Sequence, residues 1–152
     1  MNQSLQMQYA PTSRCFGCGP ANDKGLRIQS FVDGDRIKAT FLPQEHHQAF
    51  EGVINGGIIG SLLDCHCNWA ASYFLMKEKQ LTEPPCTVTA EYKIQLLAPT
   101  PKQELTLDCG LVRLEGSKAW IEGHLSVQGK ITATCEGLFV AVKPGHPAYH
   151  RW

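Results

Sequence analysis

The residues from Glu51 to Asp64, EGVINGGIIGSLLD, give the clearest indication of the fold of this 152-residue chain. It leads into an apolar segment, Gly56 to about Lys77, whose large side chains recur at helical spacing. Asp64 is the only formal charge between Gly52 and Met76. A surface helix would carry Lys and Glu on its outer side, but here that side holds small residues: Gly60, Ser61, Asn68, Ala71 and Ser72. The pattern predicts one long helix, buried on most sides, that another surface approaches closely.

Segments typical of β-strands lie on both sides of this helix. Before it, Leu26–Val32 and Arg36–Leu42 flank an Asp-Gly pair, which is typical of a hairpin turn. After it, residues 87–96 alternate between apolar and polar, and three strands joined by short turns follow: Gln103–Leu114, Lys118–Val127 and Lys130–Val142. Short turns between long strands indicate an antiparallel meander. One sheet that covers one apolar helix gives an α+β architecture of two layers.

The composition fits a single domain and argues against several classes of partner. Fourteen Lys+Arg balance fourteen Asp+Glu, whereas a nucleic-acid binder should show an excess of positive charge. No signal-peptide pattern and no membrane-length apolar run is present, so we expect a cytoplasmic protein with no membrane partner. Only 18% of residues are charged, below the usual quarter or so, which favours a subunit interface. We expect a flexible arm at 1–14, the domain at 15–142 and a tail at 143–152.

Three further features accompany the helix stretch: Cys15-Phe16-Gly17-Cys18-Gly19 near the start, a strand from Thr89 that runs to Pro99-Thr100-Pro101, and Glu136–Val140 in the last strand. With the glycine pair and the Asp seven residues after its second glycine, they resemble the PaaI-type hotdog-fold acyl-CoA thioesterases of the 4-hydroxybenzoyl-CoA thioesterase-like superfamily. The resemblance implies a hotdog fold, an antiparallel sheet wrapped around one long buried central helix. It also implies thioester hydrolysis in a homodimer, or a dimer of dimers, whose sites straddle two chains.

Gly56 and Gly57 stand where the predicted helix begins. Backbone N–H groups at a helix start lack partners within the helix, and the helix dipole favours negative charge there. Such a donor can polarise a thioester carbonyl and contribute on the order of 3 kcal/mol to transition-state stabilisation. A Gly-Gly pair also serves simply to allow a tight turn into a helix. The residues alone leave both interpretations open, and the resemblance places Gly57 in the catalytic machinery.

Asp64 follows Gly57 by seven residues, about 10 Å along a helix. A carboxylate inside an otherwise uncharged segment is costly to bury unless it is hydrogen-bonded or functional. A partly buried carboxylate suits the role of general base or of nucleophile toward an acyl carbon. The alternative is a structural aspartate held by Ser61 or Asn68. Because the resemblance implies shared sites, Asp64 of one subunit would face Gly57 of the other.

The resemblance also marks positions around the substrate. The family's usual His before the glycine pair is Asn55 here, a favoured helix N-cap that cannot exchange protons. A family position some six residues earlier, often Asn or Gln, falls on Ala49, beside Gln48. Thr89 matches a Ser/Thr position that orients the attacking water in related enzymes, although threonine is also ordinary on a strand. The predicted substrate-binding residues are Asn55, Gly56, Gln48, Ser61 and Asn68.

The cysteines raise the question of a metal or redox site. Cys15 and Cys18 have suitable spacing, but no second Cys or His pair at metal spacing follows, and a structural zinc needs four ligands. Cys65, His66 and Cys67 are neighbours on the predicted helix and point about 100° apart, so they do not converge as metal ligands or as a Cys–His nucleophile. We therefore expect no metal and no cofactor, with the other cysteines filling the core.

Three functions follow from these residues. The leading one is a thioesterase acting on acyl-CoA, with acyl-carrier protein as the less favoured substrate. The main competitor is a non-catalytic hotdog module that binds acyl-CoA as a sensor or scaffold, and Asn55 in place of His favours it. A hotdog hydratase is third, because the sequence offers no His/Asp pair near the glycine loop.

Overall fold

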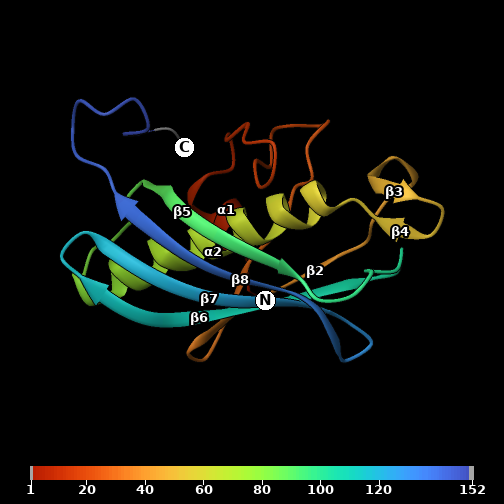
Figure 1. The fold of residues 1–152 in the computed structure, drawn as a ribbon. Helices are drawn as coiled ribbons and strands as arrows, with labels where there is room; N and C mark the ends of the chain where they lie inside the picture. Colours follow the sequence, from red (N-terminus) through yellow and green to blue (C-terminus); the bar gives the residue numbers. More distant parts are fainter. Residues whose placement is uncertain (1, 151–152) are drawn as a thin grey trace.

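The computed structural model describes residues 2–150 and shows one long helix lying along a curved antiparallel sheet (Figure 1). The sheet has six strands in the order β1-β2-β6-β7-β8-β5. Their bounds are Phe31–Asp33 for β1, Arg36–Phe41 for β2, Thr87–Leu96 for β5, Leu105–Glu115 for β6, Lys118–Val127 for β7 and Lys130–Ala141 for β8. The central helix, α2, runs from Gly56 to Glu78. This arrangement confirms the predicted hotdog fold.

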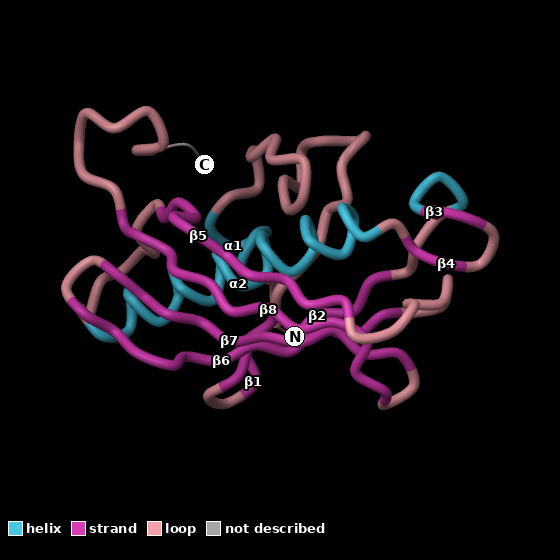
Figure 2. The backbone as a smooth tube through the Cα atoms, viewed as in Figure 1, coloured by secondary structure: helices cyan, strands magenta, loops and turns pink. Residues whose placement is uncertain are grey.

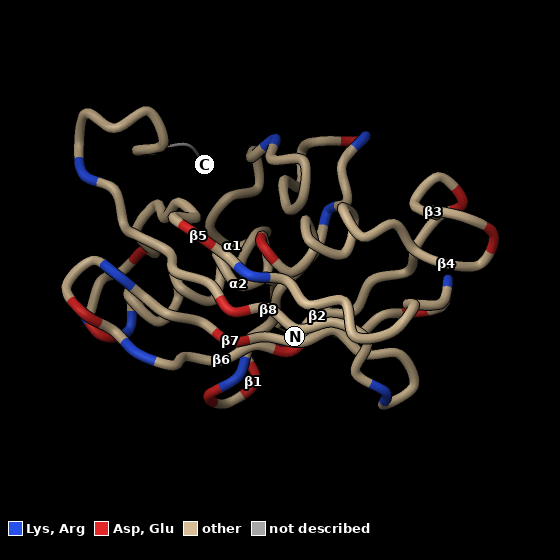
Figure 3. The backbone as a smooth tube through the Cα atoms, in the orientation of Figure 1, with Lys and Arg blue, Asp and Glu red and all other residues tan. Residues whose placement is uncertain are grey.

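The core lies between α2 and the concave face of the sheet, where the helix packs on β5, β6, β7 and β8. Side chains in β7 alternate between buried and partly exposed along the whole strand, as a sheet with one covered face requires. The largest fully buried side chains come from both layers, among them Leu62, Leu63, Leu107, Leu125 and Phe139. Figure 3 shows most of α2 without charge and the charged residues gathered on loops and on the sheet. The predicted burial of the helix is confirmed.

The start of α2 is fixed by a small second sheet. Two short strands, β3 (Gln48–Phe50) and β4 (Val53–Ile54), follow the 3-10 turn η1 (Glu45–His47) and form a two-stranded antiparallel pair. Gly52 between them has φ of 80°, a conformation that glycine adopts without strain. The Ile54 amide donates to the Thr100 carbonyl at 2.9 Å. The Pro99–Pro101 turn therefore anchors the loop from which α2 begins.

The N-terminal region differs from the expectation of a flexible arm at residues 1–14. Leu5–Tyr9 form a short helix, α1, and the side chains of Leu5 and Gln6 are buried. Gln6 is held by Ser30, because its Oε1 accepts from the Ser30 amide at 2.8 Å and its Nε2 donates to the Ser30 hydroxyl at 3.0 Å. One buried glutamine thus attaches α1 to the body of the domain.

The first predicted hairpin strand is shorter than expected. Residues 26–30 lie outside β1, although Leu26 and Ile28 are buried. Their amides donate to the carbonyls of Phe16 and Gly17, at 2.8 and 3.0 Å, so this segment pairs with the Cys15–Cys18 loop and not with β2. Figure 2 shows the long loop region between α1 and β1 crossing the side of α2 that the sheet leaves uncovered. At the other end, residues 143–150 form turns, and positions 151 and 152 of the predicted tail lie outside the described residues.

Candidate functional site

Asp64 and Thr89 form a hydrogen-bonded pair between α2 and the edge strand β5. The Thr89 hydroxyl donates to Asp64 Oδ1 at 2.6 Å, and both side chains are half-buried. An irregularity in the β5–β8 pairing falls at this point, since Thr89 pairs with Phe139 while Glu91 pairs with Leu138. Such a bulge re-aims a side chain, and bulges are frequent next to active sites. The structure thus brings together the two residues predicted to act on the attacking water.

The sequence named Ser61 and Asn68 as alternative partners of Asp64, and the hydrogen bond described above comes from Thr89. Asn68 is engaged elsewhere, because its Oδ1 accepts from the Thr87 hydroxyl at 2.6 Å. Thr87 also lies 3.0 Å from the hydroxyl of Ser72. Asn68 therefore serves the junction between α2 and the start of β5, and Ser61 is half-buried one turn before Asp64.

The start of α2 is capped by Asn55, as its N-cap propensity predicted. Asn55 Oδ1 accepts from the amides of Gly57 at 2.8 Å and Ile58 at 3.2 Å. These two amides are therefore occupied by a side-chain oxygen, whereas the sequence predicted open donors. The side-chain oxygen of Asn55 therefore occupies the position that a thioester carbonyl oxygen would need to take in order to accept from the Gly57 amide. A Cβ added to Gly57 would lie 2.9 Å from Asn55 Oδ1, so the glycine keeps this approach open.

The side chain of Gln48 forms hydrogen bonds within its own loop. Its Oε1 accepts from the Gly52 amide at 2.7 Å, and its Nε2 donates to the Glu45 backbone and carboxylate oxygens at 3.0 Å each. These bonds hold the β3–β4 loop next to the helix start. In a single protomer Gln48 therefore shapes the loop, while Gly57 and Asp64 stand two turns apart on one helix, about 10 Å by the standard rise.

β5 is one of the two edge strands of the sheet, and within residues 2–150 it pairs only with β8. From Ala90 to Leu96 most of its side chains are exposed, including two large apolar ones, Tyr92 at 47% and Leu96 at 56%. Leu97 just beyond it is 58% exposed. Exposed apolar edges of this kind are usually covered in the functional protein. The edge begins beside Thr89, so whatever covers it approaches Asp64.

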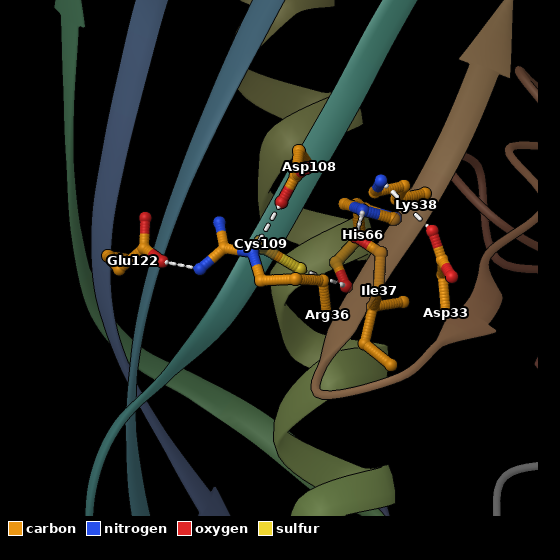
Figure 4. Close-up of polar contacts among 8 residues, drawn as sticks. All are labelled: Asp33, Arg36, Ile37, Lys38, His66, Asp108, Cys109 and Glu122. Carbon is orange, nitrogen blue, oxygen red and sulfur yellow. Dashed lines mark hydrogen bonds and ion pairs between the residues drawn. The ribbon is translucent and has the colours of Figure 1, made fainter.

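His66 faces away from the candidate site, into the sheet. It is fully buried, with Nε2 3.0 Å from the Ile37 carbonyl and Nδ1 2.8 Å from the Ser30 hydroxyl. These partners make Nε2 the protonated donor and Nδ1 the acceptor. Burial lowers the pKa of His66 to about 4. Figure 4 shows the imidazole beside Ile37 on β2. Both ring nitrogens of His66 are therefore engaged by β2 and by the segment before β1.

The outer face of the sheet carries a separate polar group. Arg36 donates from Nε to Asp108 at 2.6 Å and from Nη1 to Glu122, bridging β2, β6 and β7 (Figure 4). A shallow groove of about 560 Å³ lies nearby on the same face, with Trp120 and the carboxylates of Glu122 and Glu136 in its lining. Glu91 and Lys93 also line this groove, and Glu122 in its lining is the residue paired with Arg36.

The sequence missed one cluster altogether. The sulfur atoms of Cys15, Cys18 and Cys65 lie within 4.8 Å of one another, with Cys15 and Cys65 Sγ atoms 3.7 Å apart. The Cys15–Cys18 spacing was visible, but the third sulfur comes from a helix 50 residues away. Hydrogen bonds from the thiols of Cys18 and Cys65 lower the pKa of Cys15. The sequence offered no second pair at metal spacing and placed the other cysteines in the core, whereas the structure brings the single sulfur of Cys65 to the Cys15–Cys18 pair.

An α+β fold in which a curved antiparallel sheet wraps one long helix defines the hotdog class of proteins. No family model and no curated protein matches this sequence. Among solved structures, a thioesterase superfamily protein from Shewanella loihica is 31% identical, with a TM-score of 0.66, and the match covers 82% of this chain and 98% of that one. The chain therefore belongs to the thioesterase superfamily.

Two more distant structures share the fold. A putative thioesterase from Ralstonia eutropha, described as a phenylacetic acid degradation-related protein, is 20% identical with a TM-score of 0.69; the match covers 92% of this chain and all (100%) of that one. A Bacillus halodurans protein whose structure was solved with CoA is 22% identical with a TM-score of 0.64, over 78% of this chain and 76% of that one. Within residues 2–150, no helix has the length and hydropathy needed to cross a membrane.

Proposed function

We propose that this protein is an acyl-CoA thioesterase that works as a homodimer, alone or paired into a dimer of dimers. Each site would combine Asp64 and Thr89 of one protomer with the helix start at Gly57 of the partner subunit. The observation that carries this proposal is the 2.6 Å bond from Thr89 to Asp64 at the exposed edge strand. Membership of the thioesterase superfamily and the fold shared with a protein solved with CoA support the reaction and the substrate class.

Hydrolysis needs a nucleophile at the acyl carbon and a proton for the departing sulfur. The oxygen of water adds to the acyl carbon, the carbon–sulfur bond breaks, and the proton taken from water ends on the CoA thiolate. Asp64 acts either as the base that accepts this proton or as a nucleophile that attacks first and is then released by water. Thr89, by donating to one carboxylate oxygen, orients Asp64 toward the substrate.

Asn55 must move for the Gly57 amide to polarise the substrate carbonyl. Its Oδ1 now accepts from that amide at 2.8 Å, and losing an N-cap bond costs about 1 kcal/mol. An oxyanion donor contributes on the order of 3 kcal/mol in the transition state. The gain from a bond between the Gly57 amide and the oxyanion exceeds the cost of losing its bond to Asn55. We therefore expect the thioester oxygen to displace Asn55 Oδ1 from this amide.

The experiment compares wild type with Asp64→Asn on short, long and aromatic acyl-CoA esters, with detection of the released thiol. Asp64→Asn should lower kcat by about 10²–10⁴-fold or more while a non-hydrolysable CoA thioether still binds. Asp35→Asn, the same substitution at an exposed turn, is the matched control and should retain full activity. Turnover by Asp64→Asn near the wild-type rate would make the carboxylate structural and end the proposed mechanism.

The second candidate is a non-catalytic module that binds acyl-CoA as a sensor or scaffold. One observation favours it: Asn55 cannot exchange protons, and it occupies the Gly57 amide. Such a module would bind the CoA thioether with no thiol release from any acyl-CoA or acyl-carrier protein.

For either function we propose the reducing cytoplasm as the location. The seven cysteines of this protein are all free thiols, which supports this proposal.

A further inference from the structure

Three sulfur atoms from two distant parts of the chain meet where the N-terminal loop crosses α2. Cys15 and Cys18 come from the loop, and Cys65 comes from the helix. All three sulfurs lie within 4.8 Å of one another, and no other His, Cys, Asp or Glu in residues 2–150 joins them at that distance. Neither the proposed hydrolysis nor the packing of the sheet uses this cluster.

The separation of the Cys15 and Cys65 sulfurs fits two ligands of a common ion better than a disulfide bond. A disulfide joins sulfurs about 2.05 Å apart, whereas Cys15 and Cys65 Sγ are 3.7 Å apart. Zinc–thiolate bonds of about 2.3 Å with tetrahedral angles place ligand sulfurs about 3.8 Å from each other. The 3.7 Å between the Cys15 and Cys65 sulfurs therefore matches the distance between two thiolate ligands of one metal ion.

The loop is built so that its sulfurs can reach the helix. A Cβ on Gly17 would lie 2.4 Å from Cys65 Sγ, so only glycine permits this approach. At Gly19 a Cβ would lie 2.4 Å from the Cys15 amide nitrogen, so glycine is required there too. The Ile28 amide holds the Gly17 carbonyl at 3.0 Å. The backbone thus fixes the loop over Cys65 before any ion binds.

A buried donor supports the sulfur of Cys18. The Trp69 indole N–H donates to Cys18 Sγ at 3.4 Å, and these side chains are 2% and 7% exposed. A hydrogen bond to a ligand sulfur from outside the coordination sphere is a regular feature of metal sites, and it tunes the ligand and holds its orientation. Cys15, by contrast, is exposed. The site is therefore buried on the Trp69 side and open to solvent on the Cys15 side.

We propose that Cys15, Cys18 and Cys65 bind one thiophilic cation, Zn²⁺ or Cu⁺, which clamps the N-terminal loop onto α2. Soft thiolates select these ions. Three sulfurs satisfy Cu⁺ directly, and Zn²⁺ would take water or another exchangeable ligand on the open Cys15 side. The thiols release their protons to solvent as the ion binds, so no oxidant or reductant is required. This site is independent of the proposed thioesterase activity.

The test adds Zn²⁺ or Cu⁺ to metal-free full-length protein kept reduced with a phosphine, with Co²⁺ as the spectroscopic probe of thiolate ligation. Wild type should bind one equivalent, show a thiolate-to-Co²⁺ charge-transfer band and unfold at a higher temperature with the bound ion. Cys15→Ser and Cys65→Ser should each weaken binding by more than about 100-fold, and Trp69→Phe by about 10-fold. Cys86→Ser, at a buried cysteine outside the cluster, is the matched control and should bind like wild type.

Separate titrations with Zn²⁺ and with Cu⁺ distinguish the two ions, because tight binding of only one of them identifies the ion that the cysteines bind. The proposal is overturned if neither ion binds, or if Cys65→Ser binds as tightly as wild type. It is also overturned if mild oxidation of wild type yields a Cys15–Cys18 or Cys15–Cys65 disulfide while both ions fail to bind, which would make the cluster a redox pair. Cys15 is exposed, so Cys15→Ser should fold and keeps the test valid even if Cys65→Ser does not.

Discussion

His66 should make the stability of this protein depend on pH. Burial holds its folded-state pKa at about 4, against an ordinary 6.5. Between these values the unfolded chain binds a proton that the folded protein rejects, so the free energy of unfolding increases with pH. The contribution is fully present above about pH 6.5 and is lost as the pH falls toward about 4. At 1.36 kcal/mol per pKa unit, the loss between about pH 7 and about pH 5 is roughly 2 kcal/mol.

Urea unfolding at those two pH values, followed by circular dichroism, measures this loss. His47 adds to it in the same direction because burial also lowers its pKa, so the quantity that isolates His66 is the difference between wild type and His66→Gln. The glutamine stays neutral and can still reach the Ile37 carbonyl, and most of the roughly 2 kcal/mol should disappear. His146→Gln, at an exposed histidine far from His47 in the chain, is the matched control. If His66→Gln loses as much stability on acidification as wild type, the imidazole is not the group that resists protonation.

Three further outcomes test the site and its assembly. Thr89→Ala should lower kcat by about 10-fold, less than Asp64→Asn, because a repositioned water can replace the hydroxyl that holds the carboxylate; equal losses in steady-state assays would contradict an orienting role. Asn55→Ala should lower the free energy of unfolding by about 1 kcal/mol through loss of the N-cap, which thermal or urea unfolding can measure, and an unchanged stability would show that the two cap bonds contribute nothing. Leu96→Lys, at a 56% exposed position on the edge strand, should shift the protein from dimer to monomer in sedimentation at micromolar concentration, whereas a wild-type monomer under the same conditions would count against a shared site.

The elements with strong periodicity could be predicted closely from the sequence. The predicted helix from Gly56 matches α2, and the predicted strand Lys118–Val127 matches β7 residue for residue. β7 buries every second side chain and α2 is buried on most sides, so the spacing of apolar residues marks each element along its whole length. The structure of the N-terminal region was harder to predict from the sequence, because this region has no regular spacing of apolar residues. One buried glutamine and backbone bonds to the loop hold it, and neither leaves a periodic pattern.

The spacing of residue types along the chain is enough to predict the long apolar helix, the antiparallel meander and the position of one charge, Asp64, within that helix. This spacing tells which face of an element is buried, but not which other segment packs against that face. The contacts of Thr89 with Asp64 and of Cys65 with Cys15 and Cys18 become visible only in the folded protein. Those contacts join residues 25 and 50 positions apart in the sequence. They form because the N-terminal loop and β5 pack on α2, and the spacing of residues within one element does not tell which distant segment its side chains will contact.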